Sequence, residues 1–457
     1  MSVVTDKKGA DGRPIPILAT DGKQLPKLLA GLGAAERRWA ERCEFDAEPN
    51  TFALVPDGKG AIARVLLGVR DGDDPWSLAG LPLKLPHARY TLGKGPIAIA
   101  PEKAAFAWDL GAYRFSRYKK PKARAADLQL AASPEVKAAL ELAAAVRLVR
   151  DIVNTPAEDM GPGELSQAVR KEADAFGGKF REWVGDELLA DNFPAIHAVG
   201  RAAARAPRLL EIRWGDPKHP RLALVGKGVC FDSGGLDLKT HEGMRLMKKD
   251  LGGAAHALAL ARLVMQRKLP ISLHLVIPTV ENAVSGNAYR PGDVVRTRKG
   301  LQVEIGNTDA EGRVILADAL AYAVEQKPRT LIDFATLTGA ARVALGPELP
   351  VLFCNDEALA ANLEAHAEKV DDPIWRLPLW RNYRRLFDSD VADINNSGRG
   401  GFAGAIVAAL FLDYFVPRDI AWAHFDVYAW NDASRPGRPV GGEAQGLRAV
   451  LAALASG

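Results

Sequence analysis

The sequence predicts an α/β protein with a central, largely buried mixed sheet covered by helices on both faces, plus a smaller N-terminal α/β domain. Three observations carry this prediction. Apolar strands alternate with helical segments through the C-terminal two thirds of the chain, as in a sheet that is buried on both faces. A chain of 457 residues is too long to fold around one ordinary hydrophobic core, so two domains are expected. A proline within a basic segment at residue 121 suggests a boundary, and we place the domains at residues 1–130 and 131–457.

Composition limits the classes of function. Charged residues at 25% and hydrophobic residues at 48% are typical of a globular protein in water, and a net charge of +4 is too small to indicate a nucleic-acid partner. The three cysteines are far apart and predict no disulfide framework. We find neither a signal peptide nor an apolar run of the roughly 20 residues that a membrane span needs. We therefore expect a cytoplasmic protein with no membrane partner.

In the N-terminal domain, residues 15–19 read as a strand between turn residues. Residues 25–45 carry Ala, Leu, Glu and Arg at helical spacing and predict one helix. Residues 52–55 and 61–69 flank a Pro-Asp-Gly turn and predict a hairpin. Helical periodicity returns over residues 101–117.

Six basic residues follow within a short segment. A cluster of this kind is either a patch for anions or nucleic acid, or a solvated helix end that runs into a linker. We favour the second interpretation, because Lys and Arg are common near helix C-termini. The six are Arg114, Arg117, Lys119, Lys120, Lys122 and Arg124.

The larger domain begins with a long helix, because Ser133 precedes Pro-Glu as an N-cap would, and this helix extends to about residue 154. The predicted strands are residues 209–214, 222–225, 271–278, 330–335 and 421–427. The predicted helices are residues 163–176, 252–266, 314–325, 357–369 and 403–415. Ligands in such folds bind beyond the carboxyl ends of the strands.

Charged residues collect at those positions, in residues 226–235, 247–250 and 307–313. Four carboxylates within about 4 Å of one another would repel by roughly 4 kcal/mol per pair at an effective dielectric constant of 20. Either they stay apart as solvated turn residues, or cations hold them together. Two divalent ions would balance their charge, and oxygen ligands suit Mn²⁺ or Mg²⁺, while Zn²⁺ also accepts them. The four are Asp232, Asp250, Asp309 and Glu311.

The heptapeptide Asn-Thr-Asp-Ala-Glu-Gly-Arg at residues 307–313 matches the signature of the leucyl aminopeptidase (cytosol aminopeptidase) family of dinuclear metallopeptidases. Residues 225–235, 244–250 and 335–340 resemble the same family, and the resemblance covers about residues 140–457. It implies a metal-dependent aminopeptidase that releases N-terminal amino acids from peptides with a free N-terminus. It also implies a homo-hexamer.

The resemblance further implies two divalent metal ions, Mn²⁺ or Zn²⁺ with Mg²⁺ or Co²⁺ as alternatives, and a bicarbonate. Lys239 would donate to the developing oxyanion, and Arg313 would hold the bicarbonate as general base. Simpler roles remain open, namely a surface ion pair for Lys239 and helix capping for Arg313. The implied metal ligands are Lys227, Asp232, Asp250, Asp309 and Glu311.

The resemblance also implies a substrate pocket. Here the sequence departs from the family, because Tyr-Ala-Trp-Asn at residues 428–431 replaces residues that are commonly small. Tyr428 could narrow the pocket and favour an N-terminal residue other than leucine, or it could pack at the end of the sheet. The implied substrate-binding residues are Met247, Asn307, Thr336, Leu337, Gly339 and Tyr428.

The sequence leaves two other functions open. A DNA-binding or regulatory protein on the same scaffold would use the six basic residues between positions 114 and 124. A two-metal phosphoesterase would use the same carboxylates. The intact heptapeptide and Lys227 count against the phosphoesterase.

Overall fold

The computed structural model describes residues 2–5, 13–74 and 76–456. The chain forms two compact units, one of Met1–Arg147 with Ala433–Val440 and the other of Leu148–Asp432 with Gly441–Gly457. Both units are α/β, so the predicted fold class is confirmed. In the described residues, no helix has the length and apolar character that crossing a bilayer would require.

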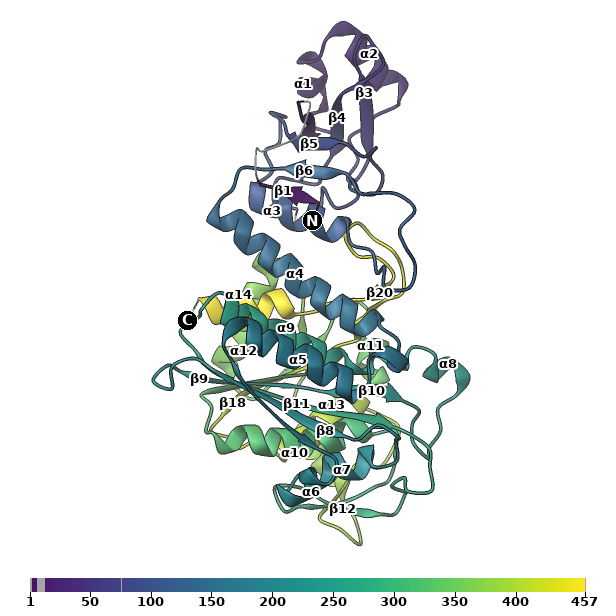
Figure 1. The fold of residues 1–457 in the computed structure, drawn as a ribbon, viewed down its shortest axis with the longest axis vertical. Coiled ribbons are helices and arrows are strands. Elements are labelled where there is room, and N and C mark those ends of the chain that lie inside the picture. The colour runs from purple at the N-terminus through teal and green to yellow at the C-terminus, as the bar shows by residue number, and fades with distance from the viewer. Residues whose placement is uncertain (1, 6–12, 75, 457) are drawn as a thin grey trace. The chain divides into compact units, whose positions relative to one another are not determined.

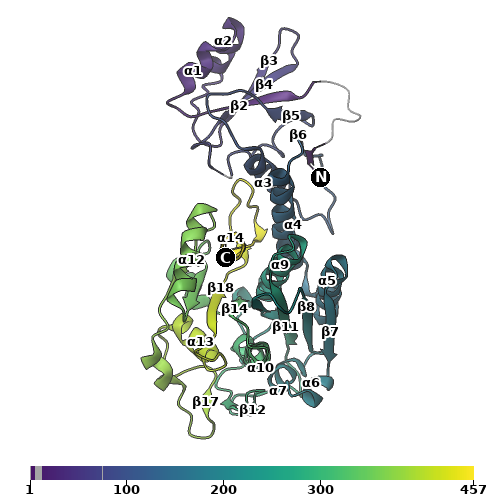
Figure 2. The same ribbon diagram turned by 90° about the vertical axis from the view of Figure 1, so that its left-hand side faces the viewer.

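The N-terminal unit is built on a six-stranded sheet in the order β1-β6-β5-β2-β4-β3, parallel except for the edge strand β3. Helices α1 and α2 pack on one face and α3 on the other (Figure 2). Its strands are β1 (Val3–Val4), β2 (Ile15–Thr20), β3 (Phe52–Pro56), β4 (Ile62–Gly68), β5 (Arg89–Leu92) and β6 (Asp127–Gln129). Its helices are α1 (Leu25–Ala30), α2 (Ala34–Arg42) and α3 (Pro101–Gly111). The predicted β3–β4 hairpin is confirmed.

Two helix predictions in this unit were wrong in extent. The single helix expected over residues 25–45 is two helices, because Gly33 has an extended backbone and its N–H donates to Glu36 Oε2 at 3.0 Å, which starts α2 anew. The helix expected over residues 101–117 ends at Gly111, where a Cβ atom would lie 2.2 Å from the carbonyl oxygen of Ala79. The six basic residues therefore lie in an irregular segment after the helix rather than at a helix end.

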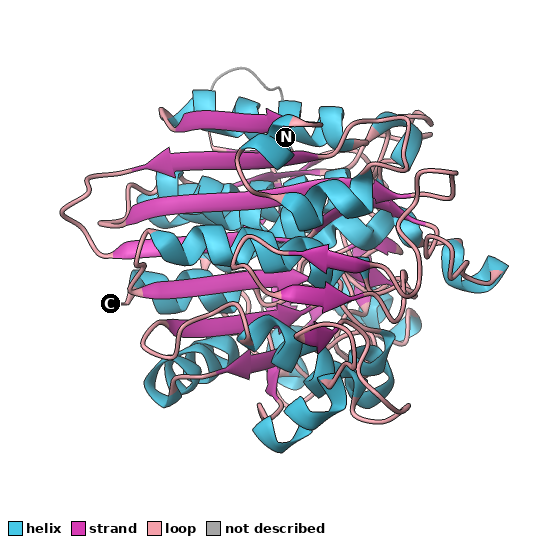
Figure 3. Ribbon diagram, turned by 90° about the horizontal axis from the view of Figure 1, so that it is seen from below, coloured by secondary structure: helices cyan, strands magenta, loops and turns pink. Residues whose placement is uncertain are grey.

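The second unit holds a nine-stranded mixed sheet (Figure 3). Its path is β16-β15-β18-β14-β9-β11-β8-β7, and β10 also pairs with β11. The strands β18, β14, β9, β11 and β10 are mutually parallel, and antiparallel strands flank them. The bounds are β7 (Lys179–Val184), β8 (Arg208–Trp214), β9 (Arg221–Gly226), β10 (Gly228–Asp232), β11 (Ser272–Asn282), β14 (Thr330–Ala335), β15 (Val351–Cys354), β16 (Trp375–Arg376) and β18 (Ala421–Asp426).

Helices cover both faces of this sheet, with α5, α9, α12 and α14 on one and α7, α10 and α13 on the other (Figure 1). These helices are α5 (Pro162–Phe176), α7 (Pro194–Gly200), α9 (Gly252–Gln266), α10 (Glu311–Glu325), α12 (Glu357–Lys369), α13 (Gly404–Asp413) and α14 (Leu447–Ala455). Helix α4 (Pro134–Asn154) begins in the first unit and ends in the second, and Ser133 Oγ accepts from Val136 N at 3.2 Å, as the predicted N-cap should. The strands and helices predicted in this domain are confirmed to within a few residues.

Smaller elements complete the unit. The short strands are β12 (Val294–Arg296), β13 (Gln302–Glu304), β17 (Ile394–Asn395), β19 (Trp430–Asn431) and β20 (Gly441–Gly442). The short helices are η1 (Ala157–Asp159), α6 (Glu187–Ala190), α8 (His241–Met244), η2 (Met247–Leu251), α11 (Gly339–Leu345) and η3 (Arg381–Phe387).

The parallel strands end together. In register, Ala335 of β14 pairs with Asp426 of β18, and Phe334 pairs with Gly226 of β9. The residues that follow these strands, Lys227 and Thr336 among them, therefore emerge at one edge of the sheet. That is the edge at which ligands of such sheets are expected.

A buried charge network ties helix α10, which begins at this edge, to the sheet below it. Glu211 Oε1 accepts from His274 Nε2, Tyr322 Oη and Arg213 Nε, each at 2.8 Å. These residues come from β8, β11 and α10. Burial alone would raise the pKa of Glu211, but the hydrogen bonds from His274 and Tyr322 outweigh it and lower the pKa to about 2.

The variant Glu211→Gln should be less stable than the wild type by about 2 kcal/mol near pH 7, the usual loss for hydrogen bonds to a charged group. Because the folded-state pKa lies below the ordinary value of 4.5, the stabilisation is full above that value and is lost as the pH falls towards 2. Urea-unfolding midpoints with chelator present, measured from neutral to acid pH, check this. The exposed acid variant Glu368→Gln is the control, and a stability difference that widened with acid would contradict the prediction.

Candidate active site

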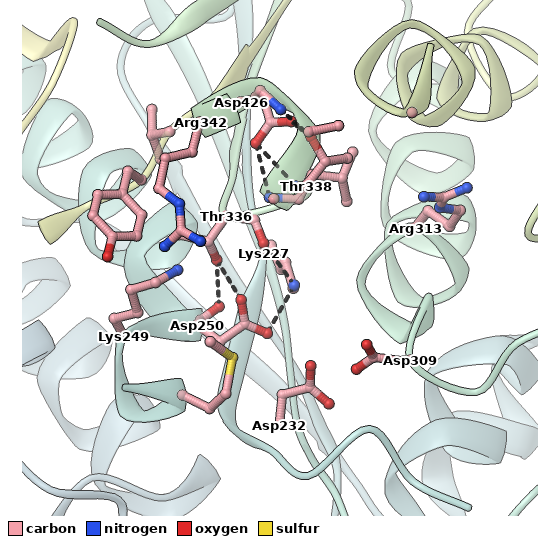
Figure 4. Close-up of a pocket in the computed structure, with 18 of the residues that line it drawn as sticks. Lys227, Asp232, Lys249, Asp250, Asp309, Arg313, Thr336, Thr338, Arg342 and Asp426 are labelled. Carbon is pink, nitrogen blue, oxygen red and sulfur yellow. Dashed lines mark hydrogen bonds and ion pairs between the residues drawn. The ribbon is translucent and has the colours of Figure 1, made fainter. Parts of the chain in front are cut away.

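A cavity of about 440 Å³ opens at the carboxyl edge of the central sheet (Figure 4). Most of the side chains singled out from the sequence line it, although they come from segments up to two hundred residues apart. Asn307 is absent from the lining. The predicted residues in the lining are Lys227, Asp232, Lys239, Met247, Asp250, Asp309, Glu311, Arg313, Thr336, Leu337, Gly339 and Tyr428.

Ends of strands and starts of helices position the charged groups. Lys227 lies between β9 and β10, and Asp232 is the last residue of β10. Asp250 belongs to the short helix η2 immediately before α9, and Glu311 is the first residue of α10. The positive end of the α10 dipole favours a carboxylate at that position.

The carboxylates converge around two lysines. Oxygens of Asp232, Asp309 and Glu311 lie within 4.8 Å of one another. Lys227 Nζ joins Asp250 to this group, at 2.8 Å from Asp250 Oδ2 and 2.9 Å from Glu311 Oε1. Lys239 Nζ pairs with Asp309 and lies 2.8 Å from Asp232 Oδ2. The two ammonium groups therefore supply positive charge between the carboxylates.

The crowding of charged groups shifts the pKa values of the residues in this cluster. Burial, followed by the charge of Asp232, raises the pKa of Glu311 to about 8 and that of Asp309 to about 6. Burial would lower the pKa of Lys227, but Asp250 and Glu311 together raise it above its usual range. The two lysines thus offset the carboxylate charge only in part.

These residues fit a divalent cation. Three carboxylates present oxygens close enough to share one ion, and hard oxygen donors suit Mn²⁺ and similar metals. Glu311 Oε2 is buried and has no hydrogen-bond donor among the residues that the structure describes. A buried carboxylate oxygen without a donor is costly, and a cation at the cluster would remove that cost.

Several residues hold the site together, and two of them, Asn282 and Asn396, were not found from the sequence. Asn282, at the end of β11, donates through Nδ2 to Asp232 Oδ1 at 2.8 Å, and Gly234 N donates to the same oxygen at 2.8 Å. Gly234 has a φ of +87°, which favours glycine and turns its N–H towards Asp232. The rule that ligands collect at carboxyl ends of strands could have pointed to Asn282.

Asn307 and Asn396 hold the loop that carries the heptapeptide, here called the signature loop (residues 307–313), through hydrogen bonds. Asn307 Oδ1 accepts from Asp309 N at 2.8 Å, and Asn396 Nδ2 donates to the Asn307 carbonyl at 2.8 Å. The Asn396 carbonyl accepts from Arg313 Nη1 at 2.8 Å. Asn307 therefore positions Asp309, and nothing local in the sequence signals Asn396, which lies about 90 residues downstream.

Tyr428 lines the cavity from its position just after β18. Its ring is flanked by Lys249 Nζ and by the guanidinium carbon of Arg342, each 4.9 Å from the ring centroid. Neither cation was among the residues proposed from the sequence. Lys249 adjoins Asp250, and Arg342 lies on α11, so both reach the same cavity.

Comparison with known proteins places these residues in a family context. The profile of the cytosol aminopeptidase family catalytic domain matches residues 147–451. The profile of the M17 aminopeptidase N-terminal domain matches residues 14–131. The two matches together cover most of the chain.

Individual proteins and solved structures are similar to this chain along nearly its whole length. A probable cytosol aminopeptidase of Geobacter sp. (strain M21) is 40% identical over 94% of this chain and 93% of its own length. The crystal structure of a cytosol aminopeptidase from Coxiella burnetii is similar with a TM-score of 0.95 and 49% identity, covering 100% of this chain and 99% of that one. The bottromycin maturation enzyme BotP in complex with Mn is similar with a TM-score of 0.87 and 32% identity, covering 97% and 99%.

The packing of Gly312 against Lys227 gives a test of the cluster. A Cβ atom on Gly312 would lie 2.4 Å from Lys227 Cε and 2.7 Å from Nζ, so Gly312→Ala should displace the lysine between Asp250 and Glu311. We expect Mn²⁺ affinity to fall by about tenfold or more, as when groups around a metal site are disturbed. Calorimetric titration with Mn²⁺ measures this.

Gly286→Ala is the matched control, because a Cβ atom there meets no atom within 4 Å. Unchanged Mn²⁺ affinity in a folded Gly312→Ala protein would show that the position of Lys227 does not matter for the metal.

Proposed function

The chain belongs to the cytosol aminopeptidase family and is a metallo-exopeptidase, and we propose that it acts through two divalent metal ions at the acidic cluster. Two dications would balance four carboxylates, which the two lysines offset only in part. Mn²⁺ or Zn²⁺ are the favoured ions, and Mg²⁺ or Co²⁺ are alternatives. The proposed ligands are Lys227, Asp232, Asp250, Asp309 and Glu311.

Lys227 must lose its proton to serve as a ligand, since an ammonium has no free lone pair. The contacts of Lys227 Nζ with Asp250, Glu311 and the carbonyl of Thr336, the last at 2.9 Å, favour its ammonium form. Dications that neutralise the same carboxylates remove the main reason for its raised pKa. When bound, such ions supply an acidified water and polarise a carbonyl oxygen.

Lys239 is the proposed electrophile. Burial would lower its pKa, but Asp232 and Glu311 raise it, so it stays protonated and can donate. It lines the cavity with 15% of its side chain exposed. A preorganised cationic donor at this position would stabilise the negative oxygen that develops as water attacks the peptide carbonyl.

Arg313 is the proposed holder of bicarbonate. One of its nitrogens donates to the Asn396 carbonyl, while its Nε is buried without a hydrogen-bond acceptor among the described residues. A planar guanidinium with donors to spare suits a small oxyanion bound by two parallel hydrogen bonds. When bound, bicarbonate supplies a base for the proton of the attacking water.

The substrate is proposed to enter with its free amino terminus towards Asp250 and its first side chain towards the wall formed by Met247, Thr336 and Tyr428. Thr336 Oγ1 donates to Asp250 Oδ1 at 2.8 Å and so fixes that carboxylate. Leu337 and Gly339 continue the wall. An internal peptide nitrogen cannot take the place of a terminal amine, which agrees with exopeptidase activity.

The proposed assembly is a homo-hexamer, and the proposed location is the cytoplasm. The family resemblance supports both, and the name of the relatives supports the location. Light scattering of the purified protein at several concentrations tests the assembly.

The function is tested with L-amino-acid p-nitroanilides in the presence of Mn²⁺, followed by a chelator. We expect cleavage that the chelator abolishes and that Mn²⁺ restores, with no cleavage of the N-acetylated substrates. A folded, Mn²⁺-loaded protein that cleaves no substrate with a free N-terminus would refute the proposal.

The variant Lys239→Ala should keep its bound metal but lose about 10²- to 10³-fold in kcat, the usual cost of removing a donor to a developing oxyanion. Steady-state kinetics and metal analysis of the same samples separate the two effects. Lys369→Ala, an exposed lysine of α12 outside the cavity, controls for the loss of one positive charge. Loss of metal along with activity would instead assign Lys239 a role in holding the cluster together.

A further inference from the structure

The cavity is electrostatically divided. Asp232 and Asp309 lie on one side of Asp250, and the charged ends of Lys249 and Arg342 gather on the other (Figure 4). Lys249 Nζ and the Arg342 guanidinium each lie 4.9 Å from the Tyr428 ring centroid. Two cations therefore line the same part of the cavity as Tyr428, where the first substrate side chain is proposed to bind.

Neither cation has a carboxylate partner among the residues that the structure describes. Within the described part of the chain, no ion pair involves Lys249 or Arg342, although only 8% of Lys249 is exposed. The neighbouring Lys248 shows that partners are within reach of this segment, because its Nζ donates to the Asn154 carbonyl at 2.7 Å. The charge of Lys249 is thus left facing the cavity.

Two carboxylates that line the same cavity, Asp250 and Asp426, are held by other groups. Asp250 accepts from Thr336 Oγ1 at 2.8 Å and pairs with Lys227 at 2.8 Å. Asp426 accepts from Thr338 Oγ1 at 2.7 Å and from the N–H groups of Leu337 and Thr338 at 3.0 and 3.2 Å. Among the described residues, neither carboxylate forms an ion pair with Lys249.

An unpaired ammonium that is largely buried is costly, and a second cation beside it adds repulsion. An anionic group at this wall would offset both costs, just as cations offset the cost of the carboxylates across the cavity. A carboxylate suits the position, since an arginine and a lysine together offer it several charged donors. The aromatic face of Tyr428 holds the cations in place without neutralising them.

We propose that Lys249 and Arg342 bind a carboxylate in the side chain of the first residue of the substrate, so that this aminopeptidase prefers peptides that begin with glutamate or aspartate. The inference rests on the proposed function, which places the terminal amine at Asp250. Lys249 adjoins Asp250 in η2, so the side chain of that same first residue is the substrate group nearest to the two cations. Tyr428 then serves as the platform between them.

The test compares α-L-glutamyl and L-glutaminyl p-nitroanilide, which have side chains of nearly equal shape but different charge, in the Mn²⁺-loaded enzyme. The wild type should give a glutamyl-to-glutaminyl ratio of kcat/KM well above one. The ratio should fall at least tenfold in Lys249→Met and in Arg342→Gln, and Lys249→Arg should retain it. Lys369→Met, which removes an exposed charge outside the cavity, should leave the ratio unchanged.

Arg342 is exposed, so Arg342→Gln gives a reading even if Lys249→Met fails to fold. A ratio near one in the wild type, or a ratio that neither variant changes, would overturn the inference and assign the two cations to packing against Tyr428. Cleavage of leucyl p-nitroanilide in the same samples keeps these outcomes distinct from failure of the proposed function, in which no substrate would be cleaved.

The carboxylate could also come from the C-terminus of a short peptide. Gln-Ala and its C-terminal amide distinguish this source from the side chain. If Lys249→Met changes the ratio between the free acid and the amide, but not the ratio between glutamyl and glutaminyl substrates, the side-chain assignment is wrong.

Discussion

The repulsion among four carboxylates at one edge of a buried sheet is the constraint on which the rest of this structure depends. At separations near 4 Å each pair costs roughly 4 kcal/mol at an effective dielectric constant of 20, which is comparable to the whole stability of a small domain. The fold supplies Lys227 and Lys239 as internal counter-charges, and Glu311 still keeps a buried oxygen without a donor. The site is therefore complete only with additional positive charge, which agrees with a family of metal-dependent peptidases.

The architecture makes this crowding possible. Five parallel strands deliver their last residues to one edge, and Glu311 stands at the positive end of the α10 dipole. The Glu211 network fixes α10 against β8 and β11 at the other end of the same helix. Polar side chains such as Asn282 and Asn396 then lock the loops that carry the carboxylates, so the charged groups cannot move apart to relieve their repulsion.

The elements and site residues that follow from a local sequence pattern were predicted. The residues that only the tertiary fold brings to the site were missed. Strands β9, β14 and β18 are apolar and short, and the signature loop with Asp309 and Glu311 is contiguous, so both were identified. The break between α1 and α2 was missed because the helical spacing of side chains continues through Gly31 and Gly33. The backbone at Gly33, however, is extended and not helical. Asn396 and Arg342 were missed because only the tertiary fold brings them beside Arg313 and Tyr428.

Each half of the cavity holds charge that the chain itself does not fully compensate, negative in one half and positive in the other. On one side, carboxylates outnumber the cations that the chain provides. On the other side, Lys249 and Arg342 line the cavity beside Tyr428 and form no ion pair with any described residue. The two sets form no ion pair with each other in the described residues, and Asp250 and Asp426 are held by Thr336, Lys227 and Thr338. A cavity kept polarised in this way favours a ligand that carries both charges, with an amine for the acidic side and a carboxylate for the basic side. A peptide that begins with an acidic residue has that distribution of charge in its first residue alone.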